Sequence, residues 1–236
     1  LSPAFVVTYK MSPMLYQLSI MKKLLFALIL FCSSQFLTAQ HLISYQLLHH
    51  YTIQDIQTIL SNFGAGSIIT PYYELDYYKI TYSTPNAQGT GNTIATGALV
   101  VPSGVTCPMP IMSYQHGTEA HRYSVPSYRG GSEFNVGIIG ASISGSICSM
   151  PDYLGLGDSP GLHPYINAAT EASASIDLLR TVRELADSIG YNLNNQLFLF
   201  GYSQGGHATM AVFREIETNL SNEFIVTACA PMSGPY

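Results

Sequence analysis

The segment 201–207, which reads Gly-Tyr-Ser-Gln-Gly-Gly-His, constrains the fold more than any other part of the chain. Four apolar residues, 197–200, precede it and are typical of a buried strand, and residues 204–220 have the apolar spacing of a helix. A Gly-x-Ser-x-Gly turn between a strand and a helix is the arrangement that lifts a serine hydroxyl out of a sheet as a nucleophile. Because the five-residue pattern alone is common, the strand before it and the helix after it carry the prediction.

This turn also predicts how the serine would work. Its glycines are needed because the turn is tight and the neighbouring backbone comes close to Ser203. The backbone N–H of Gln204 would lie at a helix N-terminus, aimed at a developing oxyanion. We therefore predict Ser203 as the nucleophile and Gln204 as an oxyanion donor; the alternative is a Gly-rich connection with an incidental serine.

Strand and helix candidates alternate along the rest of the chain. Strands are predicted over 72–83, 93–101, 109–114, 143–150, 197–200 and 224–230, and helices over 41–63, 167–189 and 204–220. The turn 86–92 joins the first two strands as an antiparallel hairpin. Because strands and helices alternate after this hairpin, we expect an α/β domain with a mostly parallel sheet.

The N-terminal residues are predicted to be a targeting segment. Met21-Lys22-Lys23 is followed by the apolar run 24–32 and by the small residue Ala39, so 21–40 has the three parts of a secretory signal peptide. The apolar run is about half the length that spans a bilayer. We expect residues 1–20 to be upstream translation and 41–236 to be a secreted or periplasmic domain with no integral membrane segment. A buried N-terminal helix is the alternative.

Charge and cysteine usage exclude other classes of function. The chain has 9 basic and 14 acidic residues, a formal charge of −5, which leaves no electrostatic footprint for nucleic acid. Cys107, Cys148 and Cys229 follow the signal segment, and we expect Cys148 and Cys229 to be free buried thiols. The pair His49-His50 has no partners at metal-ligand spacing, so no metal is expected.

Two further segments are candidates for the same site. Gly117 and Thr118 follow the strand 109–114, where the second oxyanion donor of such enzymes lies, although a His-Gly turn without chemistry is the alternative. Asp152 follows the next strand in a Gly-rich turn, on the side where sites of α/β folds form. A helix cap or turn residue is the alternative for Asp152.

Four blocks in order, 115–118, 151–159, 163–165 and 201–207, resemble the secreted bacterial α/β-hydrolases of the secretory-lipase type, relatives of the yeast lipase A family. The resemblance implies the α/β-hydrolase fold and hydrolysis of a small-molecule or lipid ester through Ser203. It also implies an oxyanion hole that draws on Gln204 and Asp152, and no metal or organic cofactor.

The remaining members of a catalytic triad are missing from this stretch of sequence. In this fold the acid and then the histidine follow the serine along the chain. After Ser203 the sequence has the acids Glu215, Glu217 and Glu223 and one histidine, His207, which lies one turn into the same helix. We therefore expect the acid and the histidine beyond residue 236. The segment 41–236 would be the N-terminal part of a longer hydrolase, truncated at its C-terminus and inactive by itself, with the last strand as a bare edge.

Three functions are consistent with these features. A secreted lipase or carboxylesterase is favoured by the blocks at 115–118 and 152–155. A secreted serine peptidase of the same fold is the second, because its nucleophile has the same surroundings. A catalytically inactive product or binding protein is the third.

Overall fold

The computed structural model describes residue 22 and residues 40–236, and the fold is that of 40–236. The predicted upstream segment and all but two residues of the predicted signal peptide lie outside the described residues. Of the helices within the described part, none has both the length and the hydrophobicity to cross a membrane.

One sheet of seven strands organises this part of the chain, in the order β1-β2-β3-β5-β4-β6-β7. The strands are β1 Leu42–Tyr51, β2 Leu75–Pro85, β3 Asn92–Pro102, β4 Met109–Gln115, β5 Ile147–Pro151, β6 Leu193–Tyr202 and β7 Val226–Met232. The helices are α2 Ile53–Asn62, η1 Pro126–Tyr128, α3 Phe134–Ser144, α4 Ala168–Ile189 and α5 Gln204–Asn219.

The directions of the strands confirm the predicted fold class. β2 and β3 form the antiparallel hairpin, in register from Leu75↔Pro102 to Pro85↔Asn92. β5, β4, β6 and β7 pair in parallel and run the same way as β2, whereas β1 and β3 run the opposite way. Five of the seven strands therefore share one direction, and the sheet is mostly parallel.

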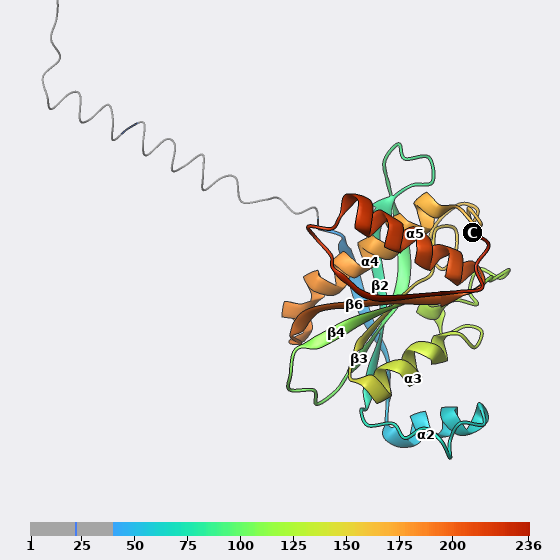
Figure 1. The fold of residues 1–236 in the computed structure, drawn as a ribbon, viewed down its shortest axis with the longest axis vertical. Helices are drawn as coiled ribbons and strands as arrows, with labels where there is room; N and C mark the ends of the chain where they lie inside the picture. The colour runs from blue at the N-terminus through green and yellow to red at the C-terminus, as the bar shows by residue number, and fades with distance from the viewer. Residues whose placement is uncertain (1–21, 23–39) are drawn as a thin grey trace, which may run out of the picture. The chain divides into compact units, whose positions relative to one another are not determined.

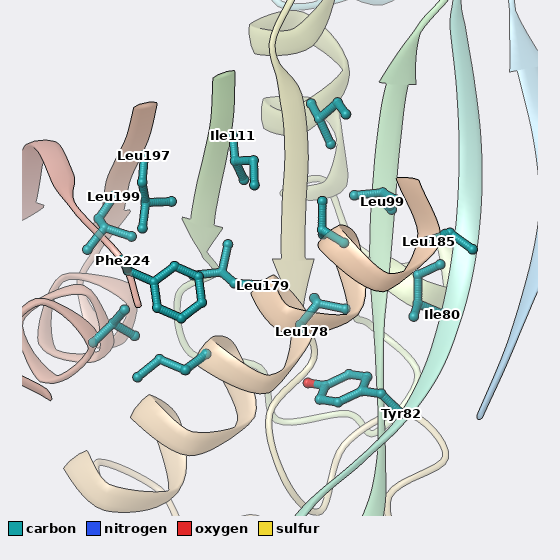
Figure 2. Packing of buried hydrophobic residues seen from close by; sticks show 14 of the residues in the cluster. Ile80, Tyr82, Leu99, Ile111, Leu178, Leu179, Leu185, Leu197, Leu199 and Phe224 are labelled. Atoms are coloured by element: carbon teal, nitrogen blue, oxygen red, sulfur yellow. The ribbon is translucent and has the colours of Figure 1, made fainter. Parts of the chain in front are cut away.

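Helices cover both faces of this sheet (Figure 1), with α4 and α5 on one face and α3 and α2 on the other. On the α4 face, Leu185 lies beside Ile80 of β2, and Leu179 lies beside Phe224 (Figure 2). Each face therefore has its own apolar core, and burial of apolar surface on both faces stabilises the layered arrangement.

The predicted helix over 41–63 is wrong in its first half, which forms the edge strand β1. β1 pairs antiparallel with β2, and its apolar residues Ile43, Tyr45 and Leu47 alternate along it, each about half exposed. The helix begins only after Thr52, whose side chain accepts from the Asp55 N–H while the Asp55 carboxylate accepts from the Thr52 N–H. The apolar alternation of β1 runs directly into the helical pattern of α2, so residue spacing alone does not separate the strand from the helix.

The predicted strand over 143–150 begins too early, because Ile143 belongs to helix α3. α3 contains Gly137 and Gly140, which lower its helix propensity. A Cβ at Gly137 would lie 2.5 Å from the Met150 sulfur, so the missing side chain lets α3 approach β5 closely. Tertiary packing thus favours a helix where local propensity does not.

Candidate active site

Ser203 lies in a sharp turn between β6 and α5. Its backbone has φ 58° and ψ −122°, a conformation that residues other than glycine rarely adopt. Its N–H donates to the Met232 carbonyl of β7 at 3.0 Å, and its own carbonyl accepts from the N–H groups of Gly206 and His207 at 2.9 and 3.2 Å. These bonds hold the turn in a strained geometry that costs about 1–3 kcal/mol.

The glycines around Ser203 are required by neighbouring strands. A Cβ at Gly205 would lie 2.0 Å from the Gln115 carbonyl oxygen of β4, and a Cβ at Gly206 would lie 2.5 Å from the Met232 carbonyl oxygen of β7. A Cβ at Gly201 would lie 2.4 Å from the carbonyl oxygen of Gly205 itself. The backbone therefore approaches Ser203 from both sides, as the sequence predicted.

The predicted site segments meet at one edge of the sheet. β4, β5 and β6 are parallel neighbours, so the residues after their carboxyl ends, 116–118, 152 and 203, lie at the same edge. A Cβ at Gly117 would lie 3.5 Å from the Tyr202 carbonyl oxygen, which places Gly117 beside the turn that carries the serine.

The N–H of Gly117 is already bonded to a carboxylate. It donates to Glu133 Oε2 at 2.6 Å, and the same oxygen accepts from the Tyr114 hydroxyl at 2.8 Å. Burial, together with Glu133, raises the pKa of Tyr114. Thr118, which is exposed, lies with its hydroxyl 3.0 Å from that of Tyr165. An oxyanion at the Gly117 N–H would have to replace the Glu133 carboxylate, a contact that no sequence spacing indicated.

Asp152 is fully buried and its carboxylate connects three segments. One oxygen accepts from the Thr96 hydroxyl of β3 at 2.6 Å, and the other accepts from the Ser127 N–H at 2.9 Å. Burial raises the pKa of Asp152, and these hydrogen bonds oppose the shift. Both oxygens are thus engaged, one with η1 and the other with β3, so the Asp152 carboxylate connects the turn after β5 to these two elements. This is a structural role, as in the alternative of a turn residue.

The side chain of Gln204 belongs to a buried polar network that no residue spacing in the sequence indicates. Its amide nitrogen lies 2.8 Å from His163 Nε2 and donates to Glu171 Oε1 of α4 at 2.9 Å. Glu171 Oε2 lies 2.7 Å from His207 Nδ1, so the ring of His207 faces α4. Glu171 has no exposed surface.

His163 is neutral in this network. Its Nδ1 lies 2.8 Å from the Leu154 carbonyl oxygen and must donate to it, so Nε2 accepts from the Gln204 amide. Burial, more than any other cause, lowers the pKa of His163 from its ordinary value of 6.5; His116 also lowers it, whereas the contacts with Leu154, Glu171 and Gln204 oppose the shift.

A dependence of stability on pH follows from His163. Because the unfolded chain takes up this proton more readily, the free energy of unfolding falls as the pH decreases from about 6.5 through the folded pKa of His163. Urea denaturation between pH 8 and pH 5 should show that His163→Gln, whose amide oxygen can still accept from Gln204, loses less stability than the wild type. His121→Gln, at an exposed loop position, is the control, and its free energy of unfolding should change with pH as that of the wild type does. Parallel curves for the wild type and His163→Gln would contradict the assignment.

The other candidate nucleophiles and metal ligands among the described residues are the cysteines and the groups of histidine and acidic side chains. Cys107, Cys148 and Cys229 are free thiols; Cys148 is buried, which raises its pKa to about 12, and Cys229 is half-buried. Within residues 40–236, no group of histidine, cysteine and acidic side chains has the arrangement of a metal site.

A mostly parallel sheet with helices on both faces, and a serine in a strained turn after β6, define the α/β-hydrolase fold. The chain is similar to a protein from Legionella pneumophila described as a hydrolase, with a TM-score of 0.78 and 36% identity over 84% of this chain and 53% of that one. It is also similar to the rice cell wall degrading esterase LipA from Xanthomonas oryzae, with a TM-score of 0.73 and 34% identity over 83% of this chain and 50% of that one.

A more distant likeness supports the fold alone. Candida antarctica lipase A in its closed state has a TM-score of 0.57 and 18% identity over 80% of this chain and 41% of that one. The chain spans about half the length of the first two solved relatives. No protein-family model matches the chain, and no curated protein matches it.

Proposed function

We propose that the chain is part of a secreted serine hydrolase that cleaves carboxylic esters through an acyl-enzyme on Ser203. The observation that carries this proposal is the backbone of Ser203, held at φ 58° between β6 and α5 by bonds to β7 and to the first turn of α5. Similarity to proteins described as a hydrolase and an esterase supports ester chemistry. The signal-like segment 21–40 supports secretion.

The reaction would proceed by acyl transfer. Ser203 Oγ attacks the ester carbonyl carbon while an imidazole removes its proton, and the negative charge that develops on the carbonyl oxygen is received by the Gln204 N–H. The tetrahedral intermediate then collapses and its bond to the alkoxy oxygen breaks, while the imidazolium donates to that oxygen the proton it removed from Ser203, so that the alcohol leaves. Water repeats the sequence on the acyl-enzyme and releases the acid.

The imidazole is not supplied by the histidines placed near the turn. His116 has Nδ1 2.7 Å from the Gly117 carbonyl oxygen and Nε2 3.2 Å from that of Asp152. His163 is bonded to Leu154 and Gln204, and His207 faces Glu171. Each of these three rings is therefore engaged with groups other than the Ser203 hydroxyl.

A substrate panel on the full-length secreted protein tests this proposal. We expect p-nitrophenyl esters to be hydrolysed, peptide p-nitroanilides to be untouched, and a fluorophosphonate probe to label Ser203 as judged by peptide mass spectrometry. Cleavage of the peptides but not the esters would instead assign a peptidase. Labelling of a serine other than Ser203 would overturn the assignment of the nucleophile.

A further inference from the structure

We propose that Glu171 is a positioning residue of the oxyanion hole. It holds the side chain of Gln204, and the backbone N–H of Gln204 donates to the oxyanion. This inference rests on the proposed function, because it concerns the same site. Glu171 is separated from Ser203 in the sequence by the rest of α4 and by β6, and it takes no part in the acyl transfer described above. Its buried carboxylate is nevertheless bonded to the residue that directly follows the nucleophile.

The Glu171 carboxylate joins the first turns of two helices. Glu171 lies in the first turn of α4, where a negative charge is favourable, and this turn is capped by Asn167. Its two oxygens bond Gln204 and His207, which lie three residues apart on one face of α5. The beginning of α5 is therefore fixed to α4 at two points.

Gln204 is also held from its other side. Its amide nitrogen contacts both Glu171 and His163, so both amide hydrogens have acceptors. His163 is itself fixed by its bond to the Leu154 carbonyl. A side chain clamped between two acceptors restricts the backbone of its own residue, and with it the direction of the Gln204 N–H.

The partners of Glu171 differ from those of the other buried acid of α4. A buried carboxylate costs several kcal/mol unless it is bonded, and Asp177 is paired with Arg180 at 2.7 Å. Within residues 40–236, no arginine or lysine pairs with Glu171, and its one ionisable partner is His207. The hydrogen bonds of the Glu171 carboxylate are thus made with the first residues of α5.

A double-mutant cycle on the full-length protein tests the proposal. We expect Glu171→Ala to lower kcat on a p-nitrophenyl ester about 10- to 100-fold, because a small displacement of an oxyanion donor has effects of this size. KM should change by less than about threefold, since the contact acts in the transition state. In a Gln204→Ala background the same change should cost little more, because the link is already cut.

Glu171→Gln should recover most of the lost kcat. Its amide oxygen still accepts from Gln204, and its amide nitrogen can donate to His207 Nδ1 once that ring takes the other tautomer. Asp177→Ala is the matched control: it removes a buried acid from the same helix and should lower the melting temperature while leaving kcat within about threefold of the wild type. A loss of kcat in Glu171→Ala no larger than in Asp177→Ala, or additive losses in the cycle, would overturn the proposal.

A readout without turnover separates this proposal from the proposed function. Amide hydrogen exchange over 203–207 should be faster in Glu171→Ala than in the wild type and unchanged in Asp177→Ala. Equal exchange in all three proteins would overturn the positioning role even if Ser203 reacts with esters. If Glu171→Ala does not fold, Glu171→Asp, which is one methylene shorter, should show the same faster exchange. If the full-length protein does not hydrolyse esters but still shows this exchange difference, the proposed function is rejected, whereas the role of Glu171 in holding Gln204 is not.

Discussion

Replacement of Ser203 by alanine should abolish ester hydrolysis, lowering kcat by at least about 10⁴-fold, because the covalent intermediate cannot form without the hydroxyl. Only transition-state contacts such as the Gln204 N–H would remain. The measurement is burst and steady-state kinetics on a p-nitrophenyl ester with purified full-length protein. Loss of the fluorophosphonate label in the same variant would show that the labelled and the reacting residue are one.

Two further variants control for this result. Ser221→Ala removes an exposed serine that follows α5 and should leave kcat unchanged. Ser203→Gly should be as inactive as Ser203→Ala but more stable, by about 1 kcal/mol, because glycine adopts φ 58° without strain. Activity in Ser203→Ala within tenfold of the wild type would reject Ser203 as the nucleophile.

Replacement of Gly205 by alanine should have the largest effect on stability, with a loss of more than about 4 kcal/mol or no folded protein. The added methyl group would lie 2.0 Å from the Gln115 carbonyl oxygen and 2.8 Å from that of His116. Both atoms are backbone, so no side chain can turn away, and α5 would have to separate from β4. Urea denaturation and the yield of soluble protein measure the effect.

Gly91→Ala is the matched control for the substitution at Gly205. A Cβ at Gly91, in the turn of the β2–β3 hairpin, would meet only the Asn86 amide nitrogen at 3.9 Å. This change should alter the free energy of unfolding by less than about 0.5 kcal/mol. Equal stability of the two variants would mean that α5 and β4 do not pack as closely as the structure places them.

The parts of the fold that local sequence determines were predicted well. The strand, tight turn and helix around Ser203 are consecutive in the chain, and the glycine positions follow from the turn itself. The α4 helix was predicted from its apolar spacing, and the structure adds that the Asn167 side chain caps its start and that it ends at Gly190. In β1 the local signals did not agree, and only pairing with β2 decides the strand.

The polar contacts of the site could not be predicted from spacing. Glu171 has the appearance of an ordinary acidic residue in a first helical turn, and its contact with Gln204 depends on how α4 and α5 pack on one face of the sheet. Glu133 contacts Gly117 from the start of α3, a helix that is not predicted from the sequence. Such contacts depend on tertiary packing, which periodicity and residue type do not specify.

The strand order has a consequence for how the protein folds. β6 leads into the turn that contains Ser203 and lies between β4 and β7, so one of its partner strands is synthesised long before it and the other after it. β4 ends at Gln115 and β6 begins at Leu193, so forming this pair closes a long loop, and the entropy of that closure is lost before the contacts of the pair can compensate for it. During synthesis on the ribosome, the reactive turn should therefore be among the last features to form, well after the β2–β3 hairpin.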